Sequence, residues 1–150
     1  LWSWARQTTG ATGPWLCGAY SAADAFFAPV AARIAAYNLP VGPEAMVYVN
    51  AHLAHPSFRR WRAMGMVDGA DQEFYRRDYP RRDWPGPVPL PAKAVDCADT
   101  VNPACPYSGK PVTHALELYG RRFGFCNAFC RDKTAADAEA WPKFMALYQS

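Results

Sequence analysis

The feature that most constrains the fold is a capped and strongly apolar helix that begins at Ser21. The Ser21 side chain can accept the backbone N–H of Asp24, and the Asp24 carboxylate can reach back to the N–H of Ser21. This pair predicts a capping box, which satisfies donors that a helix start leaves without partners. Apolar residues then recur at steps of three and four, which predicts one broad buried face. The predicted face consists of Phe26, Phe27, Val30, Ile34 and Tyr37.

The sequence around this helix resembles the C-terminal helical domain of glutathione S-transferases. The resemblance lies in the aromatic turn at 13–15, the capping box and the apolar string at 22–30. It continues at 45–61, where an apolar helix is followed by a histidine–proline pair and a tryptophan-bearing turn. It covers about residues 1–66 and implies a helical bundle that supports the electrophile-binding side of a glutathione-conjugating enzyme.

In that family the glutathione thiol is activated by an N-terminal thioredoxin-like domain, and none of its features occurs in these 150 residues. The resemblance therefore implies that the chain is the C-terminal portion of a longer transferase. It implies that glutathione is a substrate of that parent only, and that the chain alone is inactive and carries no catalytic residue. The expected partners are the thioredoxin-like domain and a second copy in a homodimer.

Composition limits the other classes of function. Half of the residues are hydrophobic (51%), which is enough for a buried core. No apolar run reaches the roughly 18 residues of a membrane span. The net charge of +3 is mild and arginines alternate with aspartates, so we expect neither a membrane nor a nucleic-acid partner. The chain has five cysteines, an odd number, and they are widely spaced. They do not form the dense, even disulfide framework of a small secreted protein, so we expect a reducing compartment and predict a cytoplasmic protein.

A stretch rich in arginine and proline divides the chain. The pattern Arg-Arg-Asp-aromatic-Pro occurs at 76–80 and again at 81–85, and three prolines follow at 87, 89 and 91. Proline cannot continue a helix, so we predict an extended linker over 76–101. A helical domain would precede it over 1–75, and a cysteine-bearing module would follow over 102–150. The repeated pattern either binds an acidic or aromatic partner or lies across its own helical domain.

Three cysteines of the last third are spaced for a common site. Cys105 lies in a sequence typical of a tight turn, and the residues from 116 to 125 alternate around Tyr119-Gly120, which predicts a β-hairpin. Cys126 follows the second strand, and Cys130 comes four residues later. If Asn127 caps a short helix, the last two sulfurs approach each other on its first turn. Three thiolates suit zinc or copper(I).

This region resembles the YHS family, small cysteine-bearing modules of metal-handling proteins. The matching segments are 102–105, the glycine-flanked 120–126, Cys130 and the acidic stretch before Trp141. Ser108 stands where a related zinc pattern has a further cysteine, so the fourth ligand is open between His114, Cys97, water and a group from the parent. Alternatively, Cys126 and Cys130 only pack against their neighbours or oxidise together.

Two further histidines, His52 and His55, lie near a helix end, where a charged imidazole interacts favourably with the helix dipole. The overall prediction is a mainly α protein that consists of a transferase-type helical bundle and a small α+β, YHS-like module. Its expected function is that of the C-terminal portion of a glutathione S-transferase family protein with an appended metal-binding module. The alternatives are a non-catalytic docking module and a metal-handling module.

Overall fold

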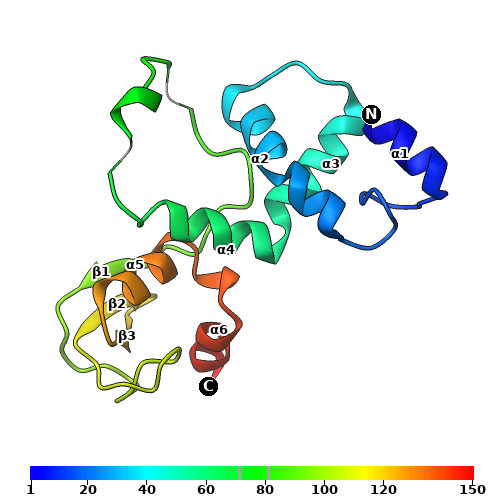
Figure 1. Ribbon diagram of the computed structural model, residues 1–150. Coiled ribbons are helices and arrows are strands. Elements are labelled where there is room, and N and C mark those ends of the chain that lie inside the picture. The colour runs from blue at the N-terminus through cyan, green and yellow to red at the C-terminus, as the bar shows by residue number, and fades with distance from the viewer. Residues whose placement is uncertain (71, 81) are drawn as a thin grey trace. The chain divides into compact units, whose positions relative to one another are not determined.

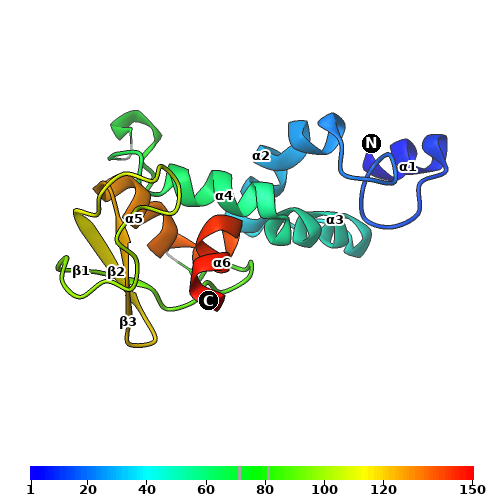
Figure 2. The same cartoon turned by 90° about the horizontal axis from the view of Figure 1, so that it is seen from below.

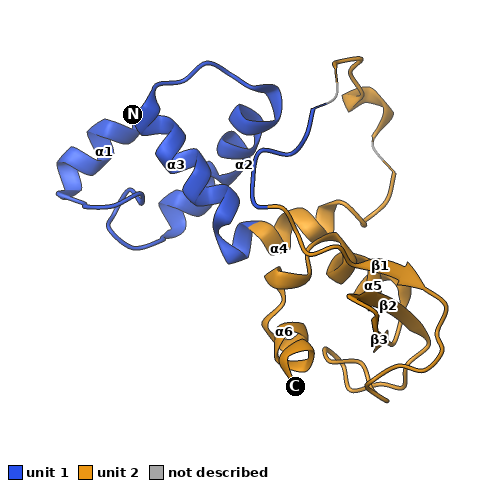
Figure 3. Ribbon diagram, turned by 180° about the vertical axis from the view of Figure 1, so that it is seen from behind, with its two compact units in different colours: residues 1–58, 81–87 blue, residues 59–80, 88–150 orange. Residues whose placement is uncertain are grey.

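The computed structural model describes all 150 residues except 71 and 81. Arg81, which opens the second copy of the predicted repeat, therefore lies outside the described residues. The chain forms two compact units, one of residues 1–58 with 81–87 and one of residues 59–80 with 88–150 (Figure 3). The described residues form six α-helices and one small three-stranded sheet. The coarse prediction of a mainly helical protein with a small sheet is confirmed.

The first unit contains three helices, α1 (Trp2–Thr9), α2 (Ala22–Tyr37) and α3 (Pro43–Ala54) (Figure 1). The predicted capping box at Ser21 and Asp24 is present at the start of α2. The helix runs through Pro29 and ends at Asn38, which adopts the left-handed conformation (φ 52°) that asparagine tolerates. Pro43 opens α3 at a position where the missing N–H costs nothing.

The core of this unit lies between α2 and α3. Ala31, Ile34 and Ala35 of α2 pack with Val49 and Leu53 of α3. The segment 81–87 belongs to the same unit because Trp84 stacks on Phe58, with ring centroids 6.4 Å apart and an angle of 9° between the planes. Small residues on α2 let the two helices approach closely.

The predicted buried face of α2 is wrong in part. Ile34 is buried and Phe27 is half-buried, but Phe26 is 87% exposed, and Val30 and Tyr37 are exposed as well. The buried side of the helix is instead the stripe of Ala31, Ile34 and Ala35. Sequence periodicity groups residues by face but does not show which face meets a neighbouring helix.

Helix α4 (Pro56–Gly65) starts within the first unit's main segment, and most of it belongs to the second unit. The tryptophan-bearing turn expected at 58–61 is thus a helix. The rest of the second unit contains β1 (Lys93–Val95), β2 (His114–Leu118) and β3 (Arg121–Phe125), followed by α5 (Ala128–Ala136) and α6 (Pro142–Gln149). Two short 3₁₀ helices cover Glu73–Tyr75 and Ala138–Ala140.

The sheet is antiparallel in the order β1-β2-β3, with Lys93 opposite Glu117 and Leu116 opposite Phe123. The predicted hairpin is confirmed: Tyr119 (φ 49°) and Gly120 (φ 78°) form a two-residue connection with both φ angles positive. Helix α5 packs on the sheet (Figure 2).

The core of the second unit is built from large side chains of the hairpin and of α6. Its largest fully buried members are Leu116, Leu118, Phe123, Phe125 and Phe144. Asp137 also belongs to this unit's interior, where its carboxylate accepts two hydrogen bonds from the Arg59 guanidinium, at 2.8 and 2.6 Å. Together the aromatic residues and this ion pair join α4, the hairpin and α6 into one unit.

The units differ from the predicted ranges 1–75, 76–101 and 102–150 in three places. Most of α4, expected in the helical domain, belongs to the second unit. Residues 81–87, expected in a linker, join the first unit through Trp84. Residues 93–95, also expected in the linker, form strand β1 of the sheet. In the described part of the chain, no helix combines the length and hydropathy that a bilayer crossing requires.

Candidate metal centre

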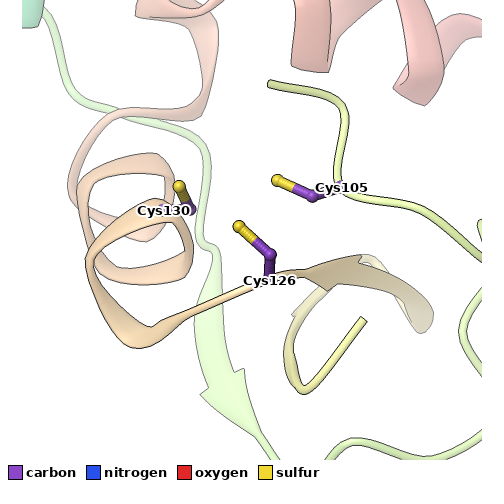
Figure 4. A group of neighbouring side chains, drawn as sticks. All are labelled: Cys105, Cys126 and Cys130. Carbon is purple, nitrogen blue, oxygen red and sulfur yellow. The ribbon is translucent and has the colours of Figure 1, made fainter. Parts of the chain in front are cut away.

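Three cysteine sulfurs converge in the second unit (Figure 4). Cys105 comes from the loop before β2, Cys126 follows the end of β3, and Cys130 lies in the first turn of α5. The three Sγ atoms all lie within 4.8 Å of one another. None of the five cysteines of the chain forms a disulfide. The convergence that the spacing predicts is therefore confirmed.

The buried side chain of Asn102 holds the Cys105 loop against the sheet. Its Oδ1 accepts the backbone N–H of Gly124 at 2.8 Å, while its Nδ2 donates to the carbonyls of Gly124 (2.9 Å) and Ala104 (2.8 Å). The loop then closes on itself, because the Cys105 N–H donates to the Lys110 carbonyl at 2.9 Å. Cys105 is thereby fixed beside the end of β3 and is only 2% exposed.

The other two sulfurs are positioned by the start of α5. The Asn127 Oδ1 accepts the backbone N–H of Cys130 at 2.8 Å, so the predicted N-cap is confirmed. The Asn127 Nδ2 lies 3.4 Å from the Cys126 sulfur, to which it donates. One asparagine thus orders both the helix start and the thiol that precedes it.

Ser108 contributes to the site although it is not a cysteine. Its hydroxyl donates to the Cys126 sulfur at 3.2 Å. This hydrogen bond fixes the Ser108 side chain against the sulfur. The position that the related zinc pattern fills with a ligand is here filled by a hydrogen-bond donor.

The electrostatic environment shifts the pKa values of Cys105 and Cys130 in opposite directions. Burial raises the pKa of Cys105, but hydrogen bonds from the backbone of Cys126 and of residues 107–108, together with the Ser108 hydroxyl, outweigh it and lower the pKa to about 7. Burial and the neighbouring sulfurs raise the pKa of Cys130 to about 11. Metal binding must therefore displace the proton that the raised pKa retains on the Cys130 thiol.

The sulfur positions fit a metal ion. Zinc–sulfur bonds of about 2.3 Å in a tetrahedral site require sulfurs about 3.8 Å apart, and a planar three-coordinate site requires about 4.0 Å. Sulfurs within 4.8 Å of one another reach either arrangement by small movements. Cys126 and Cys130 are half-buried, which leaves the site accessible from one side.

The structure does not bring the other proposed ligands into this group. His114 lies on β2, and its Nδ1 is 2.9 Å from the Thr113 hydroxyl. Cys97 is exposed. Among the described residues, the group of ligand atoms within 4.8 Å contains the three sulfurs only.

Sequence reasoning missed Lys133. Its ammonium lies over the rings of Trp141 and Tyr107, 3.8 and 4.2 Å from their centroids. Burial lowers the pKa of Lys133, and the thiolates of Cys130 and Cys105 oppose this effect. The available signal was the spacing: Lys133 follows Cys130 by three residues, which places both on one face of a helix.

The polar residues buried in the first unit play structural roles. The Asp24 carboxylate accepts the Leu16 N–H (3.1 Å) and the Tyr48 hydroxyl (3.0 Å) on one oxygen, and the N–H and hydroxyl of Ser21 (both 2.9 Å) on the other. Burial raises the pKa of Asp24, but these hydrogen bonds outweigh it and lower the pKa below its usual value. The capping residue therefore also ties the turn at Leu16 and helix α3 to the start of α2.

His52 differs from the expectation of a charged imidazole at a helix end. It is fully buried, and in the described structure neither ring nitrogen has a hydrogen-bond partner. Burial lowers its pKa. Rings of Trp15, Tyr20 and Tyr48 surround it, so the neutral imidazole acts as part of an aromatic cluster.

Comparison of the chain with models of protein families, with curated proteins and with solved structures finds no match. The convergent sulfurs are therefore the strongest basis for assigning a function.

Proposed function

We propose that the second unit binds a soft transition-metal ion, zinc or copper(I), through Cys105, Cys126 and Cys130. The observation that carries the proposal is the approach of the three sulfurs to within 4.8 Å of one another. Thiolate ligands select these ions over magnesium or calcium, which prefer oxygen. The hydrogen bonds from Ser108 and Asn127 to Cys126 add to the support, because they fix the position of this sulfur in the group.

The bound ion would add a direct link between three segments that hydrogen bonds and the hydrophobic cluster already hold together. These are the loop of Cys105, the end of β3 and the first turn of α5. The unit already has an aromatic core around Phe123 and Phe144, so the metal is not its sole source of stability. The open fourth position suits an ion that is exchanged with another ligand, as in metal handling.

Elemental analysis of the 150-residue chain, purified without chelator, tests the site. We expect about one zinc or copper ion per chain, and a loss of affinity of more than about a hundredfold in Cys126→Ser. The matched control is Cys97→Ser, which removes an exposed thiol outside the sulfur group and leaves binding unchanged. A metal-free chain that takes up neither ion on titration would exclude the proposed function.

We also propose that the first unit is the C-terminal helical domain of a glutathione S-transferase family protein and forms its electrophile-binding side. The support is the capping box at the start of α2 in the aromatic and apolar setting of that family. Two checks apply. The coding sequence before Leu1 should specify a thioredoxin-like domain, and the chain alone should neither bind nor conjugate glutathione. Conjugation by the chain alone would contradict the assignment.

A further inference from the structure

Aromatic rings hold a lysine on α5, the helix that also carries Cys130. The Lys133 ammonium lies 3.8 Å from the Trp141 ring centroid and 4.2 Å from that of Tyr107. The Trp141 indole N–H donates to the Lys133 carbonyl at 3.0 Å, and the Tyr107 hydroxyl is 2.5 Å from that of Thr134. Both rings are thus anchored to α5, and the cation is confined between them.

One of the rings and the helix itself link this cation to two of the three cysteines. Tyr107 follows Cys105 by two residues, and Cys130 precedes Lys133 by three residues on the same helix face. The neighbouring charges on α5 offset each other, because Arg131 pairs with Asp132 at 2.7 Å. Lys133 is therefore the cation that contributes most directly to the field at the sulfurs among the described residues of α5.

The effect of this charge depends on the charge of the bound ion. Three thiolates and a divalent ion carry a net charge of −1, whereas three thiolates and a monovalent ion carry −2. The attraction between a fixed ammonium and the complex is twice as large in the second case. The metal-free state is common to both equilibria, so its protonation cancels when the two affinities are compared as a ratio.

Resting on the metal site proposed above, we propose that Lys133 is a specificity-determining residue that favours copper(I) over zinc at Cys105, Cys126 and Cys130. Lys133 does not bind the ion. It acts through its charge on the loaded site, held at a fixed position by Tyr107 and Trp141. The preferred cargo of the site is therefore a monovalent soft cation.

The test compares two affinities of the full 150-residue chain. Zinc and copper(I) are each titrated, without oxygen, against a chromophoric chelator of known affinity. In Lys133→Met the ratio of copper(I) to zinc affinity should fall on the order of tenfold, because one unit of charge interaction is lost. Lys133→Arg keeps the charge and should restore most of the ratio. Lys143→Met, which removes an exposed lysine of α6, should leave it unchanged.

The outcomes separate this inference from the site itself. Equal losses of both affinities in Lys133→Met would show that the side chain only supports the fold, and would overturn the inference while leaving the site intact. The same change of ratio in Lys143→Met would overturn it too, because net charge rather than position would then set the preference. A wild-type chain that binds neither ion would overturn the proposed function and this inference together.

Discussion

The two units bury ionisable groups in opposite ways. In the first unit, both oxygens of Asp24 accept protein donors, two on each oxygen. In the second unit, three sulfurs meet and the side-chain donors to Cys126 are a hydroxyl and an amide at 3.2 and 3.4 Å. A buried group whose bonding capacity is used inside the protein is structural. By contrast, convergent sulfurs that receive only weak hydrogen bonds from side chains remain able to bind a metal.

The largest expected effect is a difference in the stability that each unit loses when one of these groups is replaced. Asp24→Asn places an amide NH₂ against donors that now contact a carboxylate, and should lower the stability of the first unit by about 3 kcal/mol. Cys126→Ser in metal-free protein, at a half-buried position, should change the second unit by no more than about 1 kcal/mol. Hydrogen exchange of helix α3 and strand β3 reads each unit separately. Similar losses from both substitutions would remove the contrast.

An intermediate effect is expected from Asn102, which supports the candidate site without contributing a sulfur. In Asn102→Ala the Gly124 N–H and carbonyl lose their side-chain partner, which should cost about 2 kcal/mol. Because the same side chain positions the Cys105 loop, zinc affinity should fall about tenfold to a hundredfold. Chelator competition measures this change. Unchanged affinity would mean that the loop is positioned independently of Asn102.

The smallest effect concerns His52 and its dependence on pH. Burial lowers the pKa of His52 in the folded state, so the unfolded chain binds more protons below its ordinary value of about 6.5. The contribution of the neutral His52 ring to the stability of the fold is therefore fully present above that pH and is lost as the pH falls. His52→Phe should therefore lose less stability than the wild type between pH 7 and 5. At pH 7 the variant should lie within about 1 kcal/mol of the wild type.

Exchange of α3 amides at the two pH values measures the His52 effect. An equal decline in both proteins between pH 7 and 5 would assign the pH dependence to groups other than His52. Asp24 is not one of them, because its lowered pKa acts further into the acid range.

Local signals in the sequence predicted the elements that depend on neighbouring residues. Tyr119-Gly120 specified the hairpin, Asn127 the start of α5, and Ser21 with Asp24 the start of α2. Because the hairpin and the cap lie between Cys105 and Cys130, correct local structure was enough to predict that the sulfurs converge.

Features set by distant partners could not be predicted in this way. Strand β1 is three residues long and pairs with residues 20 to 24 positions away, so it carries no periodic signal. The exposed position of Phe26 follows from how α2 meets α3. His114 has a ligand-type side chain near Cys105 in sequence, but its strand position sends the ring toward Thr113.

The hydrogen bond from the Tyr48 hydroxyl to Asp24 should constrain how the two residues change among homologous sequences. A phenylalanine at 48 would leave one carboxylate oxygen with a single donor, and an apolar residue at 24 would leave the hydroxyl buried without an acceptor. Homologous sequences that exchange either residue should therefore exchange the other as well, so the pair should evolve as one unit even though 24 positions separate its members.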